Sequence, residues 1–239
     1  MLDKFFKLGK IVFICVLSVI SVGCSSSFNV NVDVNVHFDK KGSGVYAMTI
    51  NLENLKKGFV IFRNFKKNEL IAYEYITKNF AEIKGRVQDK YYMNKVSFVK
   101  DPEEQKFKFS FTFGSVDELN DIIKLMYGRQ IFRYDYRTDR KTKDKKFVLT
   151  NQITSLEDFG LKDFIRNDDT KIKWFSIETM LSNIEIFRTY SFEEDIKRVN
   201  TNKIKVSEDK KIANIESNLW KFTNPKNAEN KVHYVIAFN

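Results

Sequence analysis

The sequence has few of the residues on which disulfide scaffolds, His or Cys metal sites and repetitive chains depend. Its 239 residues include two Cys, two His, two Pro and nine Gly. So few Cys exclude a disulfide-dense scaffold, and so few Pro and Gly exclude collagen-like and low-complexity chains. Hydrophobic residues make up 43% of the chain and aromatic residues 15%, including 23 Phe, so we expect a globular protein with a substantial core.

Motifs of enzymatic chemistry are also lacking. The sequence contains no G-x-S-x-G turn and no phosphate-binding glycine loop. His37 and His233 each lie in an expected strand, and they could share a site only if those strands were neighbours. Glycosidase carboxylate pairs come together only in three dimensions, so the sequence leaves such a pair open. We therefore expect no catalytic residues, no metal and no cofactor.

The first 22 residues have the layout of a secretory signal. Lys4, Lys7 and Lys10 make the start basic, and an uncharged apolar stretch follows over residues 11–22. Twelve helical residues rise only about 18 Å, whereas the hydrocarbon core of a bilayer is roughly 30 Å thick. A cleaved signal peptide therefore fits better than the alternative, an uncleaved membrane anchor.

A small residue and a cysteine end this stretch, in the order Ser21-Val22-Gly23-Cys24. Here the sequence resembles bacterial lipoproteins, whose lipobox places a small residue immediately before an invariant Cys. The resemblance implies cleavage after Gly23, thioether attachment of diacylglycerol to Cys24 and, usually, acylation of the new amino terminus. Cys15 would be discarded, so the processed chain could form no internal disulfide. The alternative is an ordinary signal peptide with a bystander cysteine.

These features divide the chain into three parts. We expect a signal peptide over residues 1–23, a lipidated cysteine and short tether over residues 24–27, and a globular body over residues 28–239, with a subdomain from about residue 150 as an alternative. Two or three acyl chains would anchor the body permanently to a membrane. In Gram-negative lipoproteins Asp after the cysteine favours the inner membrane, and this chain has Ser25, so the resemblance implies the outer membrane facing the periplasm.

Alternation of apolar and polar residues predicts two β-hairpins. The first covers residues 28–38 and 46–52, across a turn that contains Gly42 and Gly44. The second covers residues 91–100 and 106–113. In its second strand four Phe point to one side and must face the core: Phe107, Phe109, Phe111 and Phe113.

Helical spacing follows each hairpin. It predicts helices over residues 53–65 and 68–83, and Ser115 with Glu118 forms a capping box that opens a helix ending at Gly128. Further strands are expected over residues 130–136, 147–149, 184–190, 203–206 and 232–238. Hairpins separated by helices predict an α+β fold, with a largely antiparallel sheet built from hairpins and helices packed on one face. This order of elements resembles uncharacterised envelope lipoproteins with such a body.

Positive charge is concentrated over residues 129–146, which carry eight basic and three acidic side chains and about half of the formal net charge of +10. Seven of these residues are candidates for binding an anionic surface: Arg133, Arg137, Arg140, Lys141, Lys143, Lys145 and Lys146. Each basic residue near such a surface contributes about 1 kcal/mol of binding free energy. The expected ligands are anionic lipid headgroups, lipopolysaccharide or another acidic envelope polymer. The alternative is an exposed hairpin edge kept soluble by Lys and Arg. We expect no nucleic acid, because an exported protein rarely meets it.

The sequence thus predicts a lipoprotein of the cell envelope, held in the membrane by acyl chains on Cys24. Its body would be a non-enzymatic module that binds or assembles other envelope components, including proteins. The first alternative is a carrier or sensor whose Phe-rich layer opens to an apolar ligand such as a lipid. An envelope hydrolase is the second alternative.

Overall fold

The structure, a computed structural model, describes nine parts of the chain. They are residues 30–51, 78, 81–87, 97–101, 106–128, 130–138, 144–152, 182–223 and 233–238. The signal peptide, Cys24, the tether, the helix expected over residues 53–65 and most of that expected over 68–83 lie outside these residues, so the domain boundaries stay predictions. Residues 81–87 are helical and bury Ile83 and Val87. Among the described helices, none is long and apolar enough to cross a bilayer.

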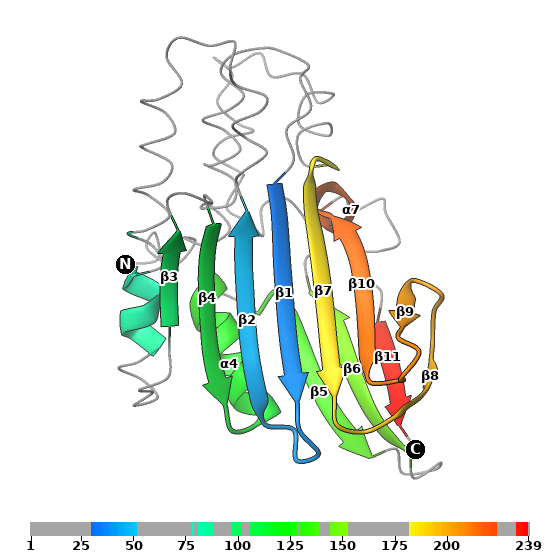
Figure 1. Cartoon of the computed structure of the whole chain (residues 1–239). Helices are drawn as coiled ribbons and strands as arrows, with labels where there is room; N and C mark the ends of the chain where they lie inside the picture. The colour runs from blue at the N-terminus through cyan, green and yellow to red at the C-terminus, as the bar shows by residue number, and fades with distance from the viewer. Residues whose placement is uncertain are drawn as a thin grey trace.

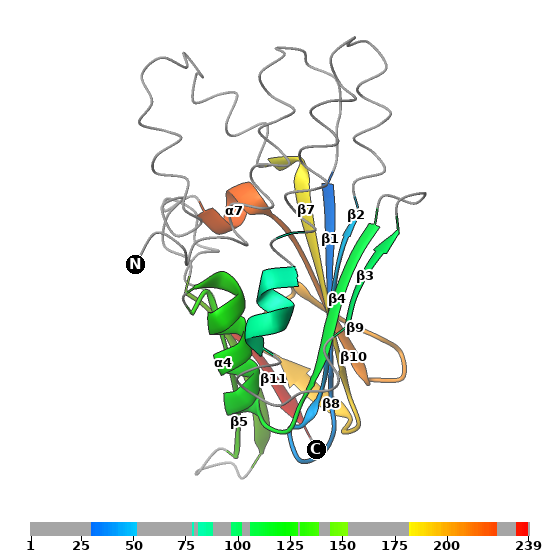
Figure 2. The same ribbon diagram turned by 90° about the vertical axis from the view of Figure 1, so that its left-hand side faces the viewer.

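In the described part of the chain two β-sheets face one another (Figure 1). The larger has seven strands in the order β3-β4-β2-β1-β7-β10-β9, with β1 at Val30–Phe38, β2 at Gly44–Asn51, β3 at Ser97–Asp101, β4 at Lys106–Phe113, β7 at Ile184–Phe192, β9 at Ile204–Val206 and β10 at Ile212–Asn218. The smaller has four strands in the order β5-β6-β11-β8, with β5 at Phe132–Thr138, β6 at Lys145–Asn151, β8 at Ile196–Val199 and β11 at His233–Phe238. Figure 2 shows the sheets as two layers.

The first predicted hairpin is confirmed as β1 and β2, which pair antiparallel. In the turn, the Asp39 carboxylate accepts hydrogen bonds from the backbone N–H groups of Lys41 (2.8 Å) and Ser43 (2.9 Å). Gly42 has φ +83°, which favours glycine, and a Cβ at Gly44 would lie 1.7 Å from the carbonyl oxygen of His37 on β1. We call this end of the sandwich the turn end, and the opposite end, where β1 begins, the Val30 end.

The Phe-rich hairpin is confirmed as β3 and β4. The four Phe of β4 are at most 3% exposed, and they face the space between the sheets. At the turn end of that space Phe38 packs against Phe113, Phe147 and Phe192, with ring centroids 5.0–5.7 Å apart. Aromatic pairs at this separation stabilise a core beyond the burial of their area.

The capped helix is confirmed as α4, Val116–Tyr127. The Ser115 hydroxyl accepts from the Glu118 N–H (3.2 Å), and Gly128 ends the helix with φ 76°. Asn120 donates to the Tyr134 carbonyl and accepts from the Tyr134 N–H, both at 2.8 Å. These two bonds occupy backbone groups of β5, an edge strand of the smaller sheet. Helix α4 thus covers a strand edge (Figure 2).

The predicted α+β fold, with helices packed on one face of a largely antiparallel sheet, is wrong. A second sheet covers much of the inner face of the larger one, and α4 lies beside its edge strand β5, behind β2 and β4 in Figure 1. The strands expected over residues 130–136, 147–149 and 232–238 form, but they pair with one another as that second sheet. Alternation indicates which residues face the core, and it does not indicate which strands pair.

Three described elements were not expected, namely β8, β10 and the short helix α7 at Leu219–Thr223. The pairing of β1 with β7 was not expected either. It is parallel and joins Val30 to Ile184, about 150 residues away along the chain. No local pattern specifies such a contact, because it depends on the whole chain closing the sheet.

Candidate functional site

The outer face of the four-stranded sheet carries a row of basic side chains. Arg137 of β5 pairs with Lys146 of β6, Lys146 with Ala237 of β11, and Ala237 with Arg198 of β8. Directly paired residues point to the same side of a sheet, with Cβ atoms about 4.5–5.5 Å apart, so these four residues form one row. The side chains of Arg137 and Arg198 are 64% and 60% exposed. We call this outer face the basic face.

Small apolar residues lie beneath the charged ones on the basic face. Val148 and Ala237 are only 7% and 2% exposed although they point outward. Long Lys and Arg side chains can cover such residues with their methylene groups while their charged ends stay in water. Farther toward the Val30 end, Arg133 and His233 flank Thr150, whose hydroxyl oxygen lies 3.0 Å from the His233 Nδ1 atom.

A β-bulge adds another positive charge at the edge of the basic face. The register of β8 against β11 shifts between Ala237 and Phe238, which makes Lys197 the extra residue of β8. Lys197 and Arg198 are both exposed, and their nitrogen atoms lie 3.4 and 3.3 Å from the Asp144 carboxylate. One carboxylate therefore faces two cations.

The charge of the basic face is positive overall. Its basic residues are Arg133, Arg137, Lys146, Lys197 and Arg198, and its acidic residues are Asp135 and Asp144. The Asp135 carboxylate lies 3.3 Å from Arg137. Both side chains of this pair are exposed, and such ion pairs contribute little free energy, so this one does not hold Arg137 away from a stronger anionic partner.

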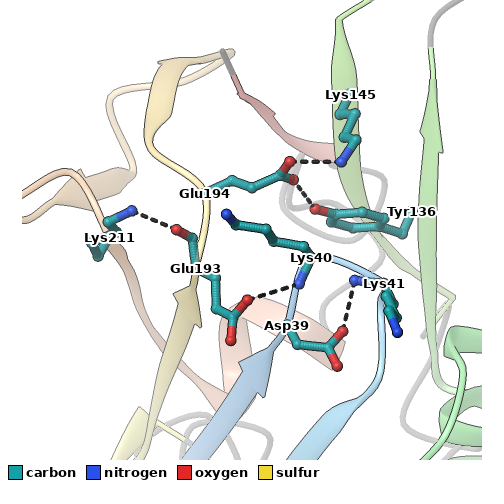
Figure 3. Close-up of polar contacts among 8 residues, drawn as sticks. All are labelled: Asp39, Lys40, Lys41, Tyr136, Lys145, Glu193, Glu194 and Lys211. Atoms are coloured by element: carbon teal, nitrogen blue, oxygen red, sulfur yellow. Dashed lines mark hydrogen bonds and ion pairs between the residues drawn. The ribbon is translucent and has the colours of Figure 1, made fainter.

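Lys145 does not belong to the basic face, because adjacent residues of a strand point to opposite sides. Its ammonium group lies 2.6 Å from a Glu194 carboxylate oxygen, and the other oxygen of that carboxylate accepts from the Tyr136 hydroxyl (Figure 3). The neighbouring Glu193 accepts from the backbone N–H of Lys40 through its carboxylate and from Lys211 through its carbonyl oxygen. These contacts join both sheets at the turn end.

The electrostatics of this group follow from its partners. Partial burial alone would raise the pKa of Glu194, but hydrogen bonds from Lys145 and Tyr136 outweigh it and hold that pKa below the usual value of 4.5. Burial and the Glu194 carboxylate raise the pKa of Tyr136. The group is therefore a neutral hydroxyl and an ion pair at neutral pH, which is a structural arrangement joining the sheets.

The other candidates fall in different places. Arg140, Lys141 and Lys143 lie outside the described residues. His37 lies on the outer face of the larger sheet, with its Nδ1 3.0 Å from the Ser191 hydroxyl, whereas His233 belongs to the smaller sheet. The two histidines therefore share no site. In the part of the chain that the structure describes, no group of three His, Cys, Asp or Glu side chains could hold a metal.

Arg188 is a buried charged residue that the sequence did not single out. It is 1% exposed, and its guanidinium carbon lies 5.5 Å from the ring centroid of Phe132 and 5.4 Å from that of Tyr234, within the range of cation–π attraction. Burial raises the pKa of the Tyr134 and Tyr190 hydroxyls, and the positive charge of Arg188 opposes that rise. Arg188 interrupts an otherwise apolar inner face of β7.

Comparisons with known proteins identify no family for the chain. No protein-family model and no curated protein matches it. One solved structure is similar, an NMR structure of the folded domain of the LppM protein of Mycobacterium tuberculosis, with 7% sequence identity, coverage of 91% of this chain and 93% of that one, and a TM-score of 0.46. At that identity and TM-score the similarity establishes neither a shared fold nor a shared function.

Proposed function

We propose that the protein is a lipoprotein of the cell envelope, anchored by acyl chains on Cys24, whose β-sandwich is a non-enzymatic binding or assembly module. The observation that carries the proposal is the order of the first 24 residues: a basic start, an uncharged and mostly apolar stretch of twelve residues, a small residue and a cysteine. The basic face is the surface we assign to binding, with anionic lipid or an acidic envelope polymer as the ligand.

The short distance between Cys24 and the body supports this proposal. β1 begins at Val30, six residues after Cys24. Six residues span at most about 20–22 Å when fully extended. A lipid on Cys24 would therefore keep the sandwich close to the membrane surface.

The packing between the sheets favours a binding module over a carrier of an apolar ligand. A carrier requires its Phe-rich layer to open onto a cavity. The Phe side chains of β4 are instead almost fully buried, and the rings around Phe38 pack at contact distance. This part of the core is occupied by the protein's own side chains.

We further propose the outer membrane, with the body facing the periplasm, because Ser25 and not Asp follows the cysteine. Separation of the two membranes by density should place the protein with outer-membrane markers. Recovery with inner-membrane markers would contradict this assignment and leave the lipid anchor intact.

Metabolic labelling tests the anchor itself. Cells that express the natural chain should incorporate a labelled fatty acid into the protein, and the Cys24→Ala variant should incorporate none. The Cys15→Ala variant is the matched control, since Cys15 lies in the segment to be removed. Equal labelling of all three chains would refute the proposed function.

A further inference from the structure

We infer that the body lies on its side against the membrane that holds Cys24, with the basic face toward anionic phospholipid headgroups. The inference rests on the proposed function, since it takes lipidation of Cys24 as given. It adds the orientation of the sandwich and commits the basic face to the lipid of the anchoring membrane.

The Val30 end and the turn end lie far apart along the strands. β1 runs from Val30 to Phe38, which are eight residues apart and therefore about 26 Å apart at 3.3 Å per residue. The basic row lies near the turn end, because Arg137 directly follows Tyr136, whose ring stacks on Phe38 with centroids 6.4 Å apart. The strands of both sheets run along the same long direction of the molecule (Figure 1).

An upright body would keep the basic row away from its own membrane. With the Val30 end down, Arg137, Lys146 and Arg198 would stand more than about 20 Å above the headgroups. Charges separated by much more than the Debye length, about 8 Å at physiological ionic strength, are largely screened. In that orientation the row would gain almost nothing from anionic lipid.

A body on its side brings the whole basic face to the surface within the reach of the tether. Packed sheets lie about 10 Å apart, so β1 would be about 10 Å farther from the lipid than the smaller sheet. The six residues from Cys24 to Val30 would span about 20 Å if extended. About 10 Å of that length would cover the height of β1, and the rest would pass around the edge of the sandwich. Arg133 and the row of Arg137, Lys146 and Arg198 would then contact the membrane together.

The charges of the two outer faces indicate which one turns toward the membrane. The described side chains of the larger sheet's outer face include three basic and three acidic ones: Lys106, Lys108, Lys205, Asp33, Glu185 and Glu216. The basic face has five basic and two acidic side chains. An anionic surface attracts basic side chains and repels acidic ones, so of these two faces the one with the net positive charge is drawn to it.

Two matched cysteine variants of the mature lipoprotein test the orientation. Thr150→Cys places a thiol on the basic face, and Thr49→Cys places one on the outer face of the larger sheet. In the processed protein the only natural cysteine is Cys24, whose sulfur would be in a thioether, so each introduced thiol can carry one fluorescent label. The labelled proteins are reconstituted into vesicles that contain phosphatidylglycerol and a headgroup quencher.

Quenching at position 150 should be several-fold stronger than at position 49. The contrast should disappear in pure phosphatidylcholine vesicles and at about 1 M salt, where the Debye length falls to about 3 Å. Arg137→Glu with Arg198→Glu should abolish it, whereas Lys106→Glu with Lys108→Glu should preserve it. Equal quenching at the two positions in phosphatidylglycerol vesicles would overturn the inference. It would also be overturned if the label at position 150 responded only to an added acidic polymer and not to the vesicles.

Flotation of the same samples distinguishes a failure of the proposed orientation from a failure of the proposed lipid anchor. Protein that floats with the vesicles but shows equal quenching refutes the orientation and keeps the lipid anchor. Protein that carries no lipid by mass and does not float refutes the proposed function itself.

Discussion

The two sheets share one core but have different outer faces. The larger sheet presents many short polar residues of the Asn, Ser and Thr type on its outer face, with balanced charges among its described side chains, whereas the smaller sheet presents an excess of Lys and Arg. In both sheets packing constrains the inward residues, because the inward side chains of one sheet must fill the space left by those of the other. Outward residues carry no such constraint, so the asymmetry of charge reflects solubility or binding. The predictions below test that difference.

Removal of the anchor should have the largest effect on how the two outer faces are held relative to the membrane. In the Cys24→Ala variant no lipid holds the body at the membrane, because acyl chains contribute about 0.8 kcal/mol for each buried CH₂ and none would remain. Only the salt-sensitive attraction of the basic face would be left. Membrane fractionation should find the variant no longer bound through lipid. An unchanged membrane fraction that resists high salt would contradict the assignment.

Disruption of the shared core should affect both faces together. Phe109 is fully buried, and Phe109→Asp should lower the free energy of unfolding by roughly 3–5 kcal/mol, because it removes a buried ring and puts a carboxylate among apolar side chains. Lys108→Asp is the matched control on the exposed side of the same strand and should change stability by less than about 1 kcal/mol. Similar denaturation midpoints for the two variants would show that the inward side of β4 is wrongly assigned.

Neutralisation of the basic row should affect one face only. Arg137→Gln with Arg198→Gln should weaken the salt-dependent affinity of the unlipidated chain for phosphatidylglycerol vesicles by about 2 kcal/mol, at about 1 kcal/mol per charge. Lys106→Gln with Lys108→Gln removes the same charge from the other outer face. If both pairs weaken binding equally, net charge and not the basic face controls the attraction.

The smallest effect is expected at the turn end, where Glu194 joins the two sheets. Its pKa is lowered in the folded protein, so its contribution to stability is present above the usual value of 4.5 and is lost as pH falls through the folded-state pKa. Glu194→Gln should cost about 0.5–1 kcal/mol at pH 7. Denaturation of both proteins from pH 7 to pH 3 should show that difference shrinking at acid pH, and a difference that is constant or grows would contradict the role of the ion pair.

The elements that were predicted correctly depend on residues close together in the sequence. The β1–β2 hairpin follows from strict alternation around Gly42 and Gly44, and α4 follows from the hydrogen bond that its N-cap Ser115 forms with Glu118. The partner of β1 on its other side could not be predicted, because the parallel pairing with β7 has no local signal. For the same reason the division into two sheets was missed.

The candidate site shows the same limit. Charge density alone identified Arg133, Arg137 and Lys146, which the structure places on one face. The alternation of side chains along β6 separates Lys145 from Lys146, whereas charge density alone does not distinguish them. Arg198 lies about 50 residues away along the chain and joins the row only through β11, so no sequence pattern links it to the others.

Mass analysis of the mature protein from its natural membrane tests the central claim most directly. We predict that the amino-terminal peptide begins at Cys24 and carries a diacylglyceryl group, with or without a further acyl chain. An amino-terminal peptide that retains residues 1–23 and a bare Cys24 thiol would contradict the anchor, and with it the orientation of the basic face toward the membrane.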